Sequence, residues 1–324
     1  MYNKILLAGG ILFFIWEENG MKQNESSLTS LVTAFSRVYH SKYDSPKVFD
    51  DFMANKLISE EEFEAISSNM IHGIHFFNGD IGKKFQDDPS KILKWITQVQ
   101  LSPISLARSA FCEKVLLNEM DLGVEQYVIL GAGLDTFCFR YPELMNKLKV
   151  FEVDHPTTQA FKKKKIEDAN FEIPNNLRFV SSDFTSRFSD QSLVDKGFDY
   201  KKTFYSLLGV SYYLTKEETA NLINSIFANV PSGSSIVFDF ADQNLFTEKG
   251  EFNRVENMVK MAAASGEPMK SNYTYQEMEH MLEKFELLIY EHLSPNDIDE
   301  RFFKSRTDYL SAFETIHFIH AVKK

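Results

Sequence analysis

The sequence predicts an α/β protein whose core is a doubly wound, mostly parallel sheet of seven strands. Two observations predict it. From Tyr127 onward, apolar runs of strand length alternate with stretches of helix length, and the first two runs end in a glycine turn and in an acid. The seven runs are Val128–Leu130, Val150–Val153, Leu177–Val180, Lys202–Leu208, Ser235–Phe240, Phe285–His292 and Thr315–Val322.

The first two strands predict a nucleotide site. Gly131, Ala132 and Gly133 follow the first strand, and glycines there allow close approach of the backbone to a ligand. A short helix expected after them would present free N–H groups. Asp154 ends the second strand, about where a nucleotide-binding βαβ unit places its ribose-binding acid. We therefore expect two neighbouring strand ends to hold one adenosine.

The glycine pattern also bears on which cofactor binds. A glycine pair after an apolar strand is a weak signal alone, because tight turns need glycine anyway. NAD sites and S-adenosylmethionine sites share this geometry. The NAD fingerprint GxGxxG would need glycine at position 136, where the chain has Thr136. The pattern therefore favours S-adenosylmethionine.

The motifs around this turn resemble the leucine carboxyl methyltransferase family. The resemblance covers Ser26 to the C-terminus and implies a class I methyltransferase-like fold, an antiparallel final strand, S-adenosylmethionine as cofactor and O-methylation. The motifs that carry it are SLTSLVTAFSRVYH with FDDFMA after it, ARSAF, LGAGLDT with FR after it, FEVDHP, SSDF, LLGVSYYL and GEPMKSNYTYQEMEHML.

The resemblance also implies individual contacts. Arg108 would meet the methionine carboxylate, for which a bidentate guanidinium is well suited. Asp183 would reach the adenine amino group, with Phe184 packed against the ring. We expect His155 and Leu208 at the cofactor as well. Thr29, Ser30 and Tyr213 lie where relatives contact substrate or cofactor, although Ser and Thr are also common in the first turn of a helix.

Leu208 departs from the family. Most relatives carry a glutamate immediately before this glycine, where it faces the cofactor. A carboxylate there could meet the methionine amino group or help to order the site, and leucine can do neither. This departure keeps open a catalytically altered protein that still binds the cofactor.

The amino-acid composition limits which classes of partner and site the chain can have. The chain has 35 basic and 46 acidic residues, a net charge of −11, so a nucleic-acid backbone would be repelled. Only two cysteines occur, which gives neither a zinc pattern nor a disulfide framework and favours the cytoplasm. We predict no metal site, and no pair formed by His317 and His320 because they point to opposite faces of a strand. The run Lys162–Lys165 is interpreted as a solvated helix face.

The domain prediction is one methyltransferase domain over residues 21–324, with a helical extension at 21–120 and a Rossmann-like part at 121–324. Residues 241–272 form a long insertion that we interpret as a lid over the substrate. Residues 1–20 are an apolar segment too short to span a bilayer, so no stable membrane insertion is expected. It could be a surface anchor, a packing helix or translated sequence upstream of a start at Met21, and we favour the last.

The predicted function is S-adenosylmethionine-dependent O-methylation of a carboxylate or ionisable hydroxyl of a small molecule. No catalytic residue is assigned, because no side chain is an obvious base. The alternatives are a catalytically altered protein that binds an adenosine cofactor and, less favoured, a nicotinamide-dependent oxidoreductase.

Overall fold

A computed structural model describes residues 26–186 and 188–324, so the prediction for residues 1–20 lies outside the described residues. The chain divides into two compact units. The helical unit contains the described residues up to Ala107, together with Asn244–Met269 and Pro295–Thr315; the sheet unit contains Arg108–Gln243, Lys270–Ser294 and Ile316–Lys324.

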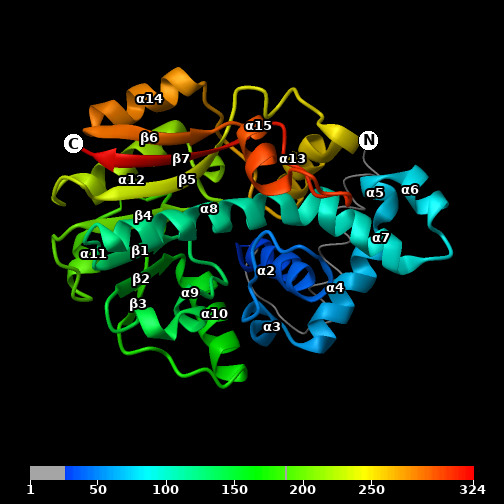
Figure 1. The fold of residues 1–324 in the computed structure, drawn as a ribbon, viewed down its shortest axis with the longest axis horizontal. Coiled ribbons are helices and arrows are strands. Elements are labelled where there is room, and N and C mark those ends of the chain that lie inside the picture. Colours follow the sequence, from blue (N-terminus) through cyan, green and yellow to red (C-terminus); the bar gives the residue numbers. More distant parts are fainter. Residues whose placement is uncertain (1–25, 187) are drawn as a thin grey trace. The chain divides into compact units, whose positions relative to one another are not determined.

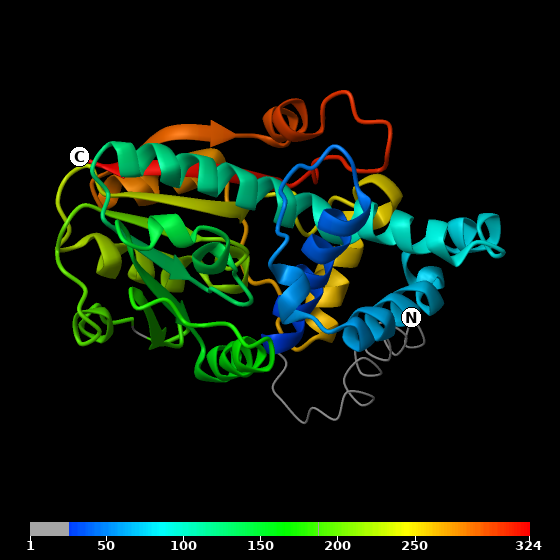
Figure 2. The ribbon, with the colours of Figure 1, turned by 60° about the horizontal axis from the view of Figure 1, so that its bottom comes forward.

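The sheet unit contains the predicted seven-stranded sheet, in the order β3-β2-β1-β4-β5-β7-β6 (Figures 1 and 2). Strands β1 to β5 are parallel, and β7 is antiparallel to both β5 and β6. The prediction of a mostly parallel sheet with an antiparallel final strand is confirmed. The strands are β1 (Gln126–Leu130), β2 (Lys149–Asp154), β3 (Leu177–Ser181), β4 (Thr203–Leu207), β5 (Ser235–Ala241), β6 (Leu287–Leu293) and β7 (Ile316–Lys323).

Helices cover both faces of this sheet because the inner strands are apolar on both sides. Phe318 of β7 stacks on Phe111, which lies in helix α8. Its neighbour Ile319 points to the other face, into a core built with residues of α12 and α14. The helices of this unit are α8 from Arg108 onward, α9 (Phe137–Arg140), α10 (Pro156–Asp168), α11 (Gln191–Val194), α12 (Lys216–Phe227) and α14 (Tyr275–Lys284).

The helical unit consists of short helices with clear start signals. Ser59 and Glu62 form a reciprocal capping box at the start of α4, as Thr274 and Glu277 do for α14 in the sheet unit. The helices of this unit are α2 (Ser26–Tyr43), α3 (Ala54–Leu57), α4 (Glu60–His72), α5 (Ile74–Phe77), α6 (Gly79–Lys84), α7 (Pro89–Ile96), the start of α8 (Ser102–Asp121), α13 (Arg254–Ala264), α15 (Pro295–Ile298), the π-helices Thr97–Leu101 and Asp299–Phe303, and the 3-10 helix Glu251–Asn253.

The long insertion leaves and rejoins the sheet unit at one place. Asp242 and Tyr273 form an isolated parallel bridge just beyond β5, and the Tyr273 amide donates to the Ala241 carbonyl at 2.9 Å. Between these points, residues Asn244–Met269 pack within the helical unit and contain α13. The insertion is therefore closed at its base by backbone hydrogen bonding.

One lysine of the predicted solvated run is buried, so that prediction is wrong for Lys162. Its side chain is 2% exposed and its Nζ lies 2.5 Å from Oε2 of Glu152, which is also 2% exposed. Neither end makes a hydrogen bond to another described group. The helix period explains the error: Lys162 lies on the inner face of α10, whereas Lys163 and Lys164 are exposed.

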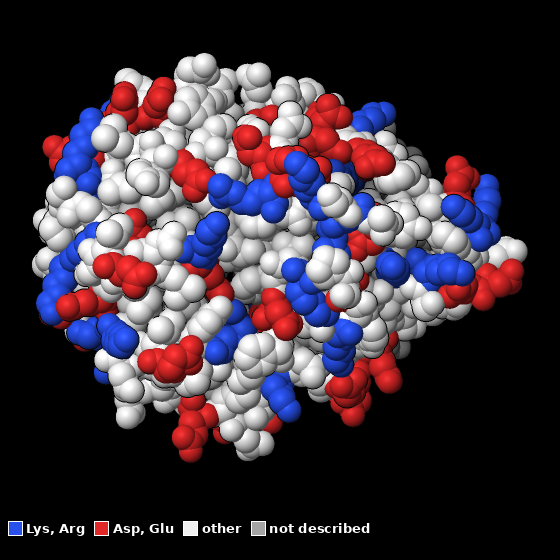
Figure 3. Space-filling model, viewed as in Figure 1, with Lys and Arg blue, Asp and Glu red and all other residues white. Residues whose placement is uncertain are grey.

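Lysine and arginine are interspersed with aspartate and glutamate on the face shown in Figure 3. No large field of one sign is visible on this face.

Within residues 26–186 and 188–324, no helix is both long enough and apolar enough to cross a bilayer.

We predict that Lys162→Met lowers the free energy of unfolding by about 3–5 kcal/mol at pH 8, because Glu152 loses its buried cationic partner and must either stay charged in the interior or take up a proton. Burial raises the pKa of Glu152 from 4.5 to about 7. The folded state therefore holds this proton more tightly than the unfolded state, and the stability contributed by Glu152 is lost as pH rises through about 7. Without Lys162 the pKa of Glu152 would rise further, so the loss should be smaller at pH 5 than at pH 8. Urea denaturation at both pH values measures it.

The matched control is Lys164→Met in the same run, because Lys164 is exposed and pairs with Asp168 at the surface. It should change stability by no more than about 0.5 kcal/mol. Equal losses for the two variants at both pH values would contradict the assignment of Lys162 as a buried partner of Glu152.

Candidate functional site

The glycine turn after β1 contacts the end of β2 and the turn that follows β4. The amide of Gly131 donates to the carbonyl of Val153, in β2, at 2.8 Å. Gly131 has φ +75°, and a Cβ on it would overlap Cγ2 of Val210, in the turn after β4. Side chains are therefore excluded at Gly131 by both the backbone angle and the neighbouring valine.

Asp154 lies beside this turn, as predicted. Its Oδ2 accepts from the amide of Gly133 at 2.6 Å, and its Oδ1 accepts from the amide of His155 at 2.7 Å. Burial raises the pKa of Asp154, and these two amides oppose the rise. A carboxylate offers about four lone-pair positions, so two hydrogen bonds leave capacity for further donors.

His155 immediately precedes helix α10 and is its N-cap residue. Its Nδ1 lies 2.7 Å from Oγ1 of Thr157 and accepts from the Thr157 amide at 3.4 Å. The ring therefore caps the helix that Pro156 opens.

Asp183 and Phe184 follow β3, the next strand outward. Oδ1 of Asp183 accepts from both the amide and the hydroxyl of Thr185, at 2.9 and 2.7 Å. These bonds lower the pKa of Asp183 and hold its carboxylate in a local turn. Phe184 is half-buried against the core of the sheet unit.

The guanidinium of Arg108 packs closely against the turn after β4. Its Nη1 donates to Asp239 Oδ2 and to the Tyr212 hydroxyl, both at 3.1 Å. Burial would lower the pKa of Arg108, but Asp239 and Tyr212 raise it above its ordinary value. Gly209 has φ +73°, and a Cβ there would lie 2.5 Å from both terminal nitrogens of Arg108. The turn therefore requires glycine where it passes the guanidinium.

Leu208 is half-buried at the end of β4, and Tyr213 packs edge-on to Tyr212 with ring centroids 4.9 Å apart. The structure places Thr29 and Ser30 in the helical unit, whereas the other predicted site residues belong to the sheet unit. The Thr29 hydroxyl donates to Oε2 of Glu267 at 2.7 Å.

Asp239 is not among the residues predicted from the sequence. A signal was available, because Asp239 is the single charged residue in the strand Ser235–Ala241 and a charge in a buried strand needs a partner. His317 pairs with His292 and with Asp242, whereas His320 pairs with Glu119.

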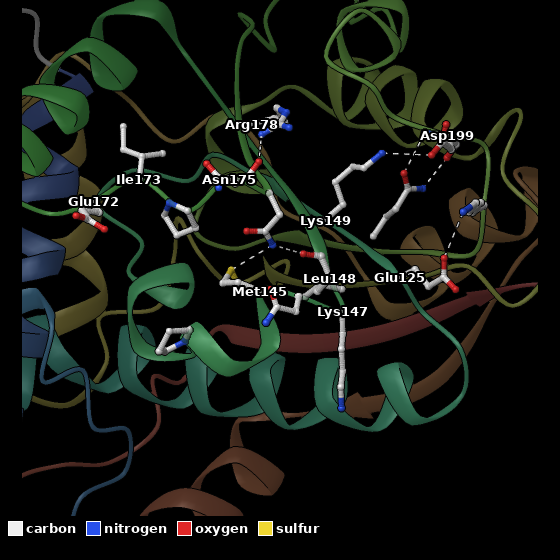
Figure 4. A pocket seen from close by; sticks show the side chains of 16 residues that line it. Glu125, Met145, Lys147, Leu148, Lys149, Glu172, Ile173, Asn175, Arg178 and Asp199 are labelled. Carbon is white, nitrogen blue, oxygen red and sulfur yellow. Dashed lines mark hydrogen bonds and ion pairs between the residues drawn. The ribbon is translucent and has the colours of Figure 1, made fainter.

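A groove of about 770 Å³ lies where β1, β2 and β3 begin, at the edge of the sheet opposite to the glycine turn (Figure 4). Its charged side chains are largely paired with one another: Lys149 with Asp199 and Lys201 with Glu125, both at 3.3 Å. Neither the glycine turn nor Asp154 lines it. The predicted site is therefore at the carboxyl edge of the strands, away from this groove.

Comparison with known families identifies the chain. The sequence profile described as leucine carboxyl methyltransferase matches residues 30–227. The chain belongs to this family. The family resemblance and the cofactor prediction are confirmed, since the chain is an S-adenosylmethionine-dependent methyltransferase. The nicotinamide alternative is therefore set aside.

Relatives and solved structures agree with this family. YktD of Bacillus subtilis (strain 168), which carries the name of an S-adenosyl-L-methionine-dependent methyltransferase, is 66% identical over 304 residues, covering 94% of this chain and 100% of that protein. A similarly named protein of Parafrankia sp. (strain EAN1pec) is 26% identical over 214 residues, 66% of this chain and 62% of that protein. A solved DUF574 family protein from Streptomyces avermitilis covers 83% of this chain and 95% of its own at TM-score 0.52 and 13% identity, which shows the fold alone.

We predict that Gly209→Ala lowers the free energy of unfolding by more than the roughly 1–2 kcal/mol of a left-handed backbone, because its Cβ would also push into the guanidinium of Arg108. Gly197→Ala is the matched control, since Gly197 has φ +88° and nothing lies within 4 Å of its added Cβ. Denaturation curves of both variants measure the difference. Equal losses would contradict close packing of the turn on Arg108.

Proposed function

We propose that this methyltransferase acts on a carboxylate or a readily ionised hydroxyl of a small molecule. When bound, S-adenosylmethionine supplies a methyl group on a positively charged sulfur, already activated for transfer. The chain then has to bind the cofactor, orient the acceptor and exclude water.

The residues of the sheet unit suit the cofactor. The turn at Gly131 has no room for a side chain, so only backbone lies there. We assign the ribose hydroxyls to Asp154, which retains lone pairs, and the methionine carboxylate to Arg108. Three of the five N–H donors of Arg108 have no partner among the described residues. We assign the adenine to Asp183 and Phe184.

One observation supports an anionic acceptor. His155, which follows the residue assigned to the ribose, is already used to cap a helix. The ring of His155 caps helix α10 through Thr157, which does not suit a dedicated proton acceptor. Burial also raises the pKa of the Tyr212 hydroxyl, which accepts from Arg108. An acceptor that is already ionised needs no base.

Holding an ionised acceptor in line with the methyl group can account for much of the rate of methyl transfer. Holding two reactants in line contributes on the order of 7–11 kcal/mol through entropy and avoided solvent reorganisation. We propose that Tyr213, in the sheet unit, helps to position the acceptor.

The acceptor class can be tested with methyl-labelled S-adenosylmethionine and a panel of small carboxylic acids, phenols, amines and thiols. We expect label on oxygen. Mild alkali releases methanol from a methyl ester and leaves an aryl methyl ether intact, which separates the two classes. Label found only on nitrogen, sulfur or carbon would contradict the proposal.

Asp154→Ala should weaken S-adenosylhomocysteine binding by about tenfold to a hundredfold, because hydrogen bonds to a charged group contribute roughly 1.5–3 kcal/mol. Calorimetric titration measures it, with thermal melting as a check of folding. Asp168→Ala at the exposed end of α10 is the control and should bind normally. A loss within about twofold for Asp154→Ala, in a folded protein, would remove Asp154 from the ribose site.

His155→Ala and Tyr213→Phe should each keep catalysis within about a thousandfold of the parent enzyme, because placement rather than proton transfer supplies the rate. The measurement is a pH–rate profile on an accepted substrate, with cofactor affinity determined separately. A larger loss at unchanged cofactor affinity would identify a true general base.

A further inference from the structure

Asp239 connects three separate segments of the sheet unit. It lies in β5 with its side chain fully buried. One carboxylate oxygen accepts from Arg108 Nη1 at 3.1 Å, and the other accepts from the amide of Gly209 at 2.6 Å. Its main-chain carbonyl accepts from the Ser211 hydroxyl at 2.6 Å. A single residue therefore holds both the arginine of α8 and the turn after β4.

These contacts fix which edge of the Arg108 guanidinium is available. Nη1 carries two N–H groups, and both are used, one by Asp239 and one by Tyr212. The remaining donors are on Nε and Nη2, and none has a partner among the described residues. Nε–H and one Nη2–H point the same way, which is the geometry that binds a carboxylate through two parallel hydrogen bonds.

The turn limits movement of the same guanidinium. Gly209 passes so close that an added Cβ would lie 2.7 Å from Cζ of Arg108. Because the Gly209 amide is itself bound to Asp239, the turn and the arginine are fixed to one carboxylate. Rotation of the guanidinium would break its bond to Asp239, and that carboxylate has no access to solvent that could replace it.

We propose that Asp239 is the positioning residue for cofactor binding: it orients Arg108 so that Nε and Nη2 receive the methionine carboxylate. This inference rests on the proposed contact between Arg108 and that carboxylate. It also explains how the site is ordered although Leu208 replaces the glutamate that most relatives carry. The carboxylate that orders the site is then that of Asp239, in β5. The charges match as well, because the Arg108–Asp239 pair is neutral overall and the amino-acid end of the cofactor is a zwitterion.

Two probes separate orientation of Arg108 from general folding. S-adenosylhomocysteine carries the amino-acid group, whereas 5′-methylthioadenosine lacks it and keeps the adenosine. In Asp239→Asn the amide oxygen can still accept from Gly209, but the amide NH₂ faces the Arg108 donor. Asp199→Asn, in the same unit and half-exposed, is the control.

Calorimetric titration of Asp239→Asn should show S-adenosylhomocysteine binding weakened by about tenfold or more, the scale of a charge-assisted hydrogen bond. Affinity for 5′-methylthioadenosine should stay within about twofold of the parent, since adenosine contacts do not involve Arg108. Asp199→Asn should change neither. Equal weakening for both probes, or no weakening for S-adenosylhomocysteine, would overturn the proposal.

A double-mutant cycle tests whether Asp239 acts through Arg108. In an Arg108→Lys background, Asp239→Asn should add little further loss, and a fully additive loss would overturn the proposed route. If Arg108→Lys leaves the ratio of the two affinities unchanged, the contact between Arg108 and the methionine carboxylate fails, and this inference with it. If Arg108→Lys changes the ratio and Asp239→Asn does not, only the inference fails.

Tyr212→Phe provides a milder variant should Asp239→Asn fold poorly. It removes the other Nη1 partner and keeps the ring. It should weaken S-adenosylhomocysteine by about two- to fivefold, the scale of one neutral hydrogen bond, and leave 5′-methylthioadenosine unchanged. If Tyr212→Phe leaves the ratio of the affinities for S-adenosylhomocysteine and 5′-methylthioadenosine unchanged, the proposal that the Nη1 partners orient Arg108 is overturned.

Discussion

The pairing of β1 with β2 on one side and with β4 on the other is the constraint on which the site depends. Parallel pairing aligns Leu130 with Val153 and with Leu207, so the three strands end in one row. The chain changes direction across the sheet at β1, and ligands of open α/β sheets generally bind beyond the carboxyl ends of the strands at such a point. The glycine turn, Asp154 and the turn at Gly209 follow directly from those ends. The strand pairing therefore determines where the candidate site lies.

Much of this arrangement could be predicted from local sequence. Apolar runs, glycine turns and capping boxes each depend on residues within a few positions of one another, and they gave the strands and several helix starts correctly. The carboxylate of Asp154 could be placed because its distance from the glycine turn is set by one βαβ unit. Family resemblance added Arg108, Asp183 and Phe184 as candidates.

Local sequence did not indicate three features of the packing. Arg108 and Asp239 are 131 residues apart, and no local pattern indicates which acid will meet which arginine. Burial of Lys162 depends on the face that α10 turns toward β2, which four identical residues in a row cannot reveal. The grouping of residues 244–269 with the helical unit likewise depends on packing. Buried charges were thus the least predictable part of the structure, because each is tolerated only where a partner arrives from elsewhere.

The bridge between Asp242 and Tyr273 has a consequence for variation within the family. Because the two ends of the insertion are joined beside β5, its length is not coupled to the register of the sheet. Doubling the length of a loop with fixed ends costs only about 0.6 kcal/mol of closure entropy. Segments of different size and composition can therefore replace one another at this point while β5, Asp239 and the strand ends stay in place. If the insertion contacts the acceptor as the sequence predicts, acceptor preference can diverge among relatives on a sheet that need not change.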